Sequence, residues 1–173
     1  MLSRCFAALA VLLVVAAPLA AQQSPPPQPL DSKTIGSWES VTWAAARVVQ
    51  MCTLVRVNVP AGEPSYGLLV DRRGVLFSVE TAAWALPNRP TDAGIAAVTG
   101  SARVLSAVPV SPRRANIDIT RYPDLLGEFQ RTERVEVSIL GVTVQLAFDG
   151  FGAARAALGT CVQQLGKEPA PAR

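Results

Sequence analysis

Residues 142–165, VTVQLAFDGFGAARAALGTCVQQL, combine the two patterns that decide the fold of this chain. Residues 142–148 alternate in hydropathy, which is typical of a half-buried β-strand. The alternation ends at Asp149-Gly150, and apolar residues then recur at helical spacing. The stretch therefore predicts a strand followed by a C-terminal helix near 150–165, with Asp149 as the N-cap. The predicted apolar face consists of Phe151, Ala154, Leu158, Cys161 or Val162, and Leu165.

Similar alternating segments precede this stretch. Residues 134–140 predict the partner strand of a hairpin that turns at Gly141. Residues 66–70 and 75–79 flank DRRG, whose first Asp and last Gly suit a type I turn. Further strands are predicted at residues 53–59, 95–99, 103–108 and 116–120.

The remaining segments complete the predicted fold class. YPDLLGEFQRTE, with Pro123 in its first turn, predicts a short helix near 123–131. Residues 37–50 fit either a strand with a turn or a short helix. No βαβ order is visible, so we predict a mainly β (α+β) fold, an antiparallel sandwich or open barrel of about seven or eight strands.

The N-terminal residues have the layout of a secretory signal peptide. Arg4 supplies a positive charge, residues 6–17 are apolar, and small residues follow at Ala20 and Ala21. The apolar run is shorter than the roughly 20 residues that span a bilayer. This favours a signal peptide over residues 1–21, which includes Cys5, against the alternative of an uncleaved anchor. No transmembrane span is expected after cleavage.

Composition divides the rest of the chain. Residues 22–35 are proline-rich and polar, which predicts a disordered linker, and residues 167–173 predict a disordered tail. Residues 36–166 are then a single domain. Arginine outnumbers lysine about sevenfold, which is typical of GC-rich bacterial genomes. Export would therefore lead to the periplasm of a Gram-negative bacterium or to its exterior.

Two cysteines remain after the predicted cleavage, Cys52 and Cys161. An even number of cysteines in an oxidising compartment predicts a disulfide. Closing a loop of about 110 residues would stabilise the fold by about 4–5 kcal/mol through the entropy of the unfolded chain. The alternative is a reactive thiol, but the chain has neither a CxxC motif nor a histidine to activate a thiolate.

The absence of histidine excludes Ser-His-Asp and Cys-His catalysis and histidine metal sites. The lysines, Lys33 and Lys167, lie in the predicted flexible flanks, where a catalytic amine could not be buried. No glycine-rich phosphate loop is present. We therefore expect no cofactor, no metal site and no enzymatic activity.

Carboxylates are the one catalytic chemistry that the composition leaves open. Nothing in their spacing singles out an acid–base pair. Asp71 is interpreted as a turn residue. Among the carboxylates, Glu80 is the best candidate for a sugar-binding site, because Trp84 follows it closely (ETAAW) and an aromatic ring beside a carboxylate suits a sugar. The carboxylates considered are Glu39, Asp71, Glu80, Asp118, Asp124 and Asp149.

Two arginine pairs, Arg72-Arg73 and Arg113-Arg114, fall in predicted turns. They are interpreted as solvated turn residues. The alternative interpretation is a binding site for lipid phosphate or nucleic acid. No basic stripe with interleaved aromatics occurs, so no nucleic acid partner is expected. The possible binding surface consists of Trp84, Glu80, Arg113 and Arg114.

The C-terminal third resembles the end of the invasion-associated locus B family, small secreted or periplasmic proteins of alphaproteobacteria. The resemblance lies in the hairpin VEVSILGVTVQLAFDGF followed by GAARAAL, and earlier in a tryptophan, then Cys52, then PDLLGEF. The chain departs from the family at Cys161 and in lacking a central cysteine pair. The resemblance implies an envelope-associated, non-enzymatic role.

Three functions follow as hypotheses. The first is a non-enzymatic periplasmic protein that binds a protein or an envelope component. The second is an inhibitor of a lytic enzyme, acting through the loop 87–94 or the loop 111–116. The third is a carboxylate hydrolase that depends on Glu80.

Overall fold

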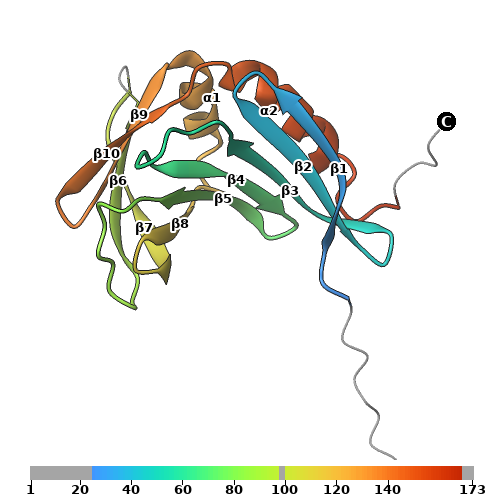
Figure 1. Cartoon of the computed structure of the whole chain (residues 1–173), viewed down its shortest axis with the longest axis horizontal. Helices are drawn as coiled ribbons and strands as arrows, with labels where there is room; N and C mark the ends of the chain where they lie inside the picture. The colour runs from blue at the N-terminus through green and yellow to red at the C-terminus, as the bar shows by residue number, and fades with distance from the viewer. Residues whose placement is uncertain (1–24, 98–99, 169–173) are drawn as a thin grey trace, which may run out of the picture.

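The computed structural model describes residues 25–97 and 100–168. The predicted signal peptide lies outside these residues, as does most of the predicted tail. The described part holds two helices, α1 (Pro123–Arg131) and α2 (Phe151–Val162), and one antiparallel sheet in the order β1-β2-β3-β4-β5-β8-β7-β6-β9-β10 (Figure 1). The strands are β1 (Gln28–Ile35), β2 (Trp38–Ala45), β3 (Val48–Arg56), β4 (Ser65–Asp71), β5 (Gly74–Glu80), β6 (Thr91–Ala97), β7 (Arg103–Ser111), β8 (Arg114–Asp118), β9 (Arg134–Ile139) and β10 (Val142–Ala147).

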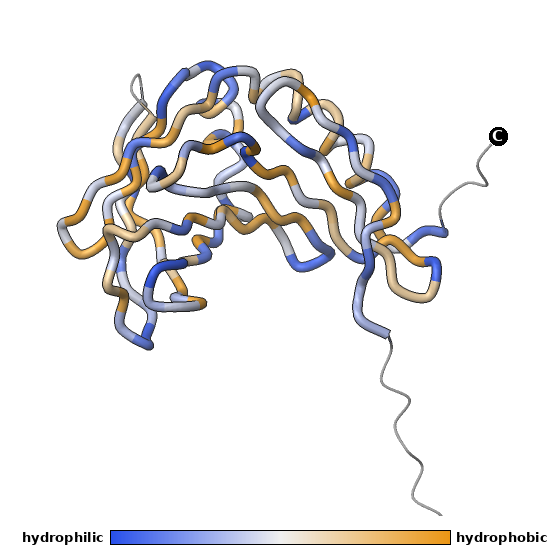
Figure 2. The backbone as a smooth tube through the Cα atoms, in the orientation of Figure 1, coloured by the Kyte–Doolittle hydropathy of each residue, from blue (hydrophilic) through white to orange (hydrophobic). Residues whose placement is uncertain are grey.

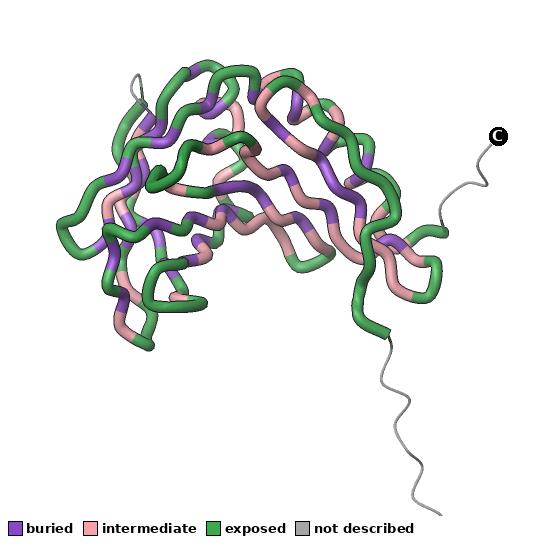
Figure 3. Tube along the Cα trace, in the orientation of Figure 1, coloured by how far each residue is buried: buried purple, intermediate pink, exposed green. Residues whose placement is uncertain are grey.

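The predicted fold class is confirmed, but the sheet has ten strands, more than the seven or eight predicted. The prediction of a disordered linker over 22–35 is wrong for residues 28–35, which form β1 and pair with β2 from Gln28↔Ala44 to Ile35↔Trp38. Almost every residue of β1 is exposed, so its composition resembles that of a linker (Figure 3). Pro29 lies at a shift in register of this edge strand, a position that tolerates proline.

The hairpin of β2 and β3 resolves the ambiguity of residues 37–50, which form a strand, a turn and a second strand. Its two turn residues are Ala46 (φ 48°) and Arg47 (φ 63°), both in the left-handed region. Left-handed dihedrals at both central positions match the twist of a two-residue hairpin, although glycine and asparagine adopt them at lower cost. The arginine in this turn is therefore held in an unfavourable backbone conformation.

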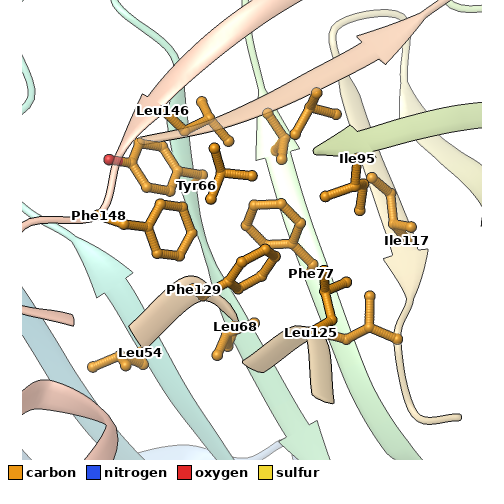
Figure 4. Packing of buried hydrophobic residues seen from close by; sticks show 14 of the residues in the cluster. Leu54, Tyr66, Leu68, Phe77, Ile95, Ile117, Leu125, Phe129, Leu146 and Phe148 are labelled. Carbon is orange, nitrogen blue, oxygen red and sulfur yellow. The ribbon is translucent and has the colours of Figure 1, made fainter. Parts of the chain in front are cut away.

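The core lies between one face of the curved sheet and the two helices (Figure 4). Leu125 and Phe129 bring α1 into the core, and Phe148 lies at its centre. The Phe148 ring centroid is 4.8 Å from that of Phe129 and 5.4 Å from that of Trp38. Such aromatic pairs add to the stability that apolar burial provides.

The sheet is not closed, yet it curls until β10 reaches the start of β4. The Tyr66 hydroxyl of β4 donates a hydrogen bond to the carbonyl of Ala147. The Trp84 indole N–H donates to the carbonyl of Val142 at 3.4 Å. Two buried aromatic side chains thus fasten the last strand to the rest of the domain.

The predicted disulfide is confirmed, because the bonded sulfurs of Cys52 and Cys161 join β3 to α2. The predicted apolar face of α2 is also confirmed, since Phe151, Ala154, Leu158 and Cys161 are buried. The prediction that Asp149 caps this helix is wrong. The N-cap is Gly150 (φ 72°), and the Asp149 carboxylate instead binds the Arg56 guanidinium at 2.9 Å.

Burial raises the pKa of Tyr66 to about 12, which makes stability sensitive to alkaline pH. The unfolded tyrosine ionises near pH 10, so the stabilisation is complete below about pH 10 and is lost as the pH rises toward about 12. We expect urea unfolding of Tyr66→Phe to show a shallower decline over this range. The variant should also lose about 1 kcal/mol at neutral pH with its hydrogen bond to Ala147. If the stability of Tyr66→Phe declines at alkaline pH as steeply as that of the wild type, the assignment to Tyr66 is wrong. Tyr122→Phe is the control and should keep the wild-type decline.

Candidate functional site

Three connecting segments meet at one end of the molecule, where β5, β7 and β9 end. These are residues 81–90, the β7–β8 turn (112–113) and the β9–β10 turn (140–141). Together with the adjoining strand residues 108–111, 114 and 142, we call them the loop end. The main-chain N–H of Thr81 donates to the Arg113 carbonyl at 2.9 Å, and that of Leu86 donates to the Pro112 carbonyl at 2.8 Å. These bonds fix the segments relative to one another on a rigid sheet, which is how folds commonly present binding loops.

Three residues of the predicted binding surface meet beside the loop end. Glu80 of β5 pairs directly with Arg114 of β8 in the strand register. The Arg114 Nε donates to the Ser78 Oγ at 3.0 Å, and Arg113 is exposed in the β7–β8 turn. The predicted loops 87–94 and 111–116 also approach each other here, next to the hydrogen bond between Leu86 and Pro112. The predicted bounds are too wide, because residues 91–94 belong to β6, Ser111 to β7 and residues 114–116 to β8.

The inclusion of Trp84 in that surface is wrong. Its side chain is 3% exposed and belongs to the core. The indole needs a partner for its N–H when it is buried, and the carbonyl of Val142 provides one. Trp84 therefore holds the β9–β10 turn in place and leaves no aromatic platform beside Glu80.

The most exposed large apolar residues lie outside the predicted binding surface. The outward face of β7 carries Val104 (71% exposed), Val108 (52%) and Val110 (57%), and the β9–β10 turn carries Leu140 (59%). The strand RVLSAVPVS has apolar residues on both of its faces, so alternation alone could not show which face is exposed. Figure 2 shows the mixture of hydrophobic and hydrophilic residues at this end of the molecule.

A shallow hollow adjoins the same region on the sheet face opposite the core. Its volume is about 180 Å³, and Glu80, Arg114 and Ser78 line one side of it. Val55 and Leu69 supply apolar surface nearby. The floor is close-packed, because a Cβ at Gly67 would lie 2.5 Å from the Leu54 carbonyl oxygen. The hollow thus offers charged and hydroxyl groups at its rim over an apolar base.

The candidate carboxylates lie on separate elements, and within the described residues all of them except Glu80 have a hydrogen-bond or ion-pair partner of their own. Asp71 accepts hydrogen bonds from the N–H groups of Arg73 (2.7 Å) and Gly74 (3.2 Å), which confirms it as a turn residue. Hydrogen bonds from Thr120 hold the pKa of Asp118 below its ordinary value. These contacts are typical of structural carboxylates.

The other carboxylates follow the same pattern. The Arg103 guanidinium binds Asp124 of α1 and lowers the pKa of that carboxyl group. Glu39 of β2 accepts a hydrogen bond from the Ser32 hydroxyl on β1. Over residues 25–97 and 100–168, no group of three or more potential ligands could hold a metal ion. In the same residues, no helix is long and apolar enough to cross a bilayer.

Comparison with known families and with curated proteins finds no match. Among solved structures, the fold is similar to the crystal structure of invasion associated protein B from Bartonella henselae. The match has a TM-score of 0.53 at 13% identity and covers 77% of this chain and 99% of that chain. The resemblance drawn from the C-terminal hairpin and helix is thus confirmed at the level of the fold.

Proposed function

We propose that this chain is a small extracytoplasmic protein without catalytic activity that binds a protein partner through its loop end. The observation that carries the proposal is the exposure of Val108, Val110 and Leu140 where several loops converge. Exposed apolar residues that gather beside charged ones are a common mark of protein-binding surfaces. Arg89, Arg113 and Arg114 are exposed at the same end and would form its polar rim.

The proposed location rests on two independent features. The Cys52–Cys161 disulfide fits an oxidising compartment, since such bonds are rare in the cytosol. The N-terminal residues have the pattern of a secretory signal. The fold similarity to invasion associated protein B is compatible with a role at the bacterial envelope.

The test is capture of a partner from an envelope extract of the source bacterium by the immobilised protein. The variant Val108→Glu/Val110→Glu places charges at exposed positions and should leave the fold intact. We expect it to bind at least about tenfold more weakly, which corresponds to about 1.4 kcal/mol. Leu30→Glu is the control, because Leu30 is an exposed apolar residue on β1 (48%). Equal capture by both variants, or no capture by the wild type, would contradict the proposal.

Inhibition of a lytic enzyme is the more specific form of this function. The β7–β8 turn supports it, because inhibitors commonly present a loop that the scaffold holds in one conformation. Arg113→Ala/Arg114→Ala would then relieve inhibition of the captured enzyme, as measured by its lytic activity. If instead the protein itself has hydrolytic activity that Glu80→Gln removes, the non-enzymatic proposal is wrong.

A further inference from the structure

The two ends of the described chain meet at one corner of the molecule, on the side where β1 begins (Figure 1). The Gly166 N–H donates to the Val49 carbonyl at 2.8 Å, and the Val49 N–H donates to the Lys167 carbonyl at 3.1 Å. A hollow of about 610 Å³ lies beside them, lined by residues 25–27, the β2–β3 turn and the β4–β5 turn. Segments from both ends of the chain and from two hairpins thus share this corner.

Cationic side chains gather at this corner. Arg47 is exposed in the β2–β3 turn, and Arg72 and Arg73 are exposed in the β4–β5 turn. The Arg73 side chain is 93% exposed, although it also contacts the Asp71 carboxylate at 3.3 Å. The Arg72 guanidinium lies against Gly166, next to Lys167. We call Arg47, Arg72, Arg73 and Lys167 the basic corner; Asp71 and Glu168 are the carboxylates described beside it.

The backbone of Arg47 points to a role for its charge. The residue adopts φ 63° in a two-residue turn where asparagine followed by glycine would be the least strained choice. A left-handed conformation costs a residue with a Cβ on the order of 1 kcal/mol. The turn therefore places a cation at its tip at the expense of stability.

We propose that the basic corner docks the domain on an anionic membrane surface, through lipid phosphate groups. The cations are exposed and spread over two hairpin tips and the C-terminal segment, which suits a flat array of phosphates. The described part of the chain begins at Pro25, which lines the hollow in the same corner. The basic corner shares no residue with the loop end. Docking through the corner would therefore leave the loop end free to bind a partner.

The test measures binding of the exported protein to vesicles of phosphatidylcholine alone and of an equimolar mixture with phosphatidylglycerol. The corner variant is Arg47→Gly/Arg72→Gln/Arg73→Gln. The matched control is Arg89→Gln/Arg113→Gln/Arg114→Gln, which removes the same charge at the loop end. Each basic residue near an anionic surface contributes roughly fivefold to binding. We expect the corner variant to bind the anionic vesicles at least about tenfold more weakly than the wild type, and the control to stay within about twofold.

The wild type should bind the anionic vesicles more tightly than the neutral ones and should be released at about 0.5 M salt, where charges are screened. Ala46→Asn/Arg47→Gly is a further variant that should unfold at a higher urea concentration than the wild type and still bind more weakly. Lost binding in this variant could not come from misfolding. Equal affinity for neutral vesicles, or equal losses in the corner and control variants, would overturn the proposal. Neither result would bear on partner capture through Val108 and Val110, so the two proposals fail separately.

Discussion

Replacing Cys52 and Cys161 together by alanine is expected to lower the free energy of unfolding by about 4 kcal/mol. The bond links residues 109 positions apart, so its loss restores a large conformational entropy to the unfolded chain. It also removes the covalent link between α2 and β3. Because α2 has two internal glycines, Gly152 and Gly159, each about 1 kcal/mol less favourable in a helix than alanine, its intrinsic stability is lowered. The loss is measured by urea unfolding. The dependence of the unfolding free energy on urea concentration shows whether the unfolded state has also changed.

Reduction of the wild type gives an independent measure of the same bond. A strong reductant should shift the wild-type transition toward that of the double variant and leave the double variant unchanged. Intact mass should show two alkylated thiols only after reduction and unfolding. If the double variant unfolds at the wild-type urea concentration, or if both thiols are alkylated without reduction, the native protein has no bond. The compartment proposed above would then lose its main structural support.

The sequence predicted those elements whose pattern is set by burial on one face. The β9–β10 hairpin and the apolar face of α2 were found because Val137, Leu146 and Leu158 point into one core at regular intervals. The pairing of Cys52 with Cys161 followed from the number of cysteines and the expected compartment. These features follow from a local sequence pattern or from the number of residues of one type, so they can be predicted without knowledge of the tertiary structure.

Other features depend on contacts that a pattern does not encode. The strand β1 is polar and almost wholly exposed, and only its hydrogen bonds to β2 define it. Asp149 has the composition of a helix cap, yet Arg56, 93 positions away, binds it. Trp84 looked like part of a surface beside Glu80, whereas its indole is buried against the β9–β10 turn. In each case the partner lies on another element and cannot be found from spacing.

Phe148→Ala is expected to destabilise the domain by about 4 kcal/mol, the range typical of a buried phenylalanine. Phe148 is 2% exposed and lies between β10 and α2. Its ring centroid lies 4.8 to 6.0 Å from those of five other aromatic residues, which come from β2, β4, β5, α1 and α2: Trp38, Tyr66, Phe77, Phe129 and Phe151. The cavity would open where all these elements meet, so no single side chain could move to fill it.

Two further variants separate packing from other causes. Phe148→Leu keeps much of the buried volume and should lose less than half of the free energy lost by the alanine variant. Val142→Ala truncates a residue of β10 that is 39% exposed and should change stability by no more than about 0.5 kcal/mol. If Phe148→Ala costs no more than Val142→Ala in urea unfolding, then the aromatic cluster does not hold the helices to the sheet. The disulfide and the other buried residues of α2, Ala154 and Leu158, would then have to hold the helix to the rest of the domain.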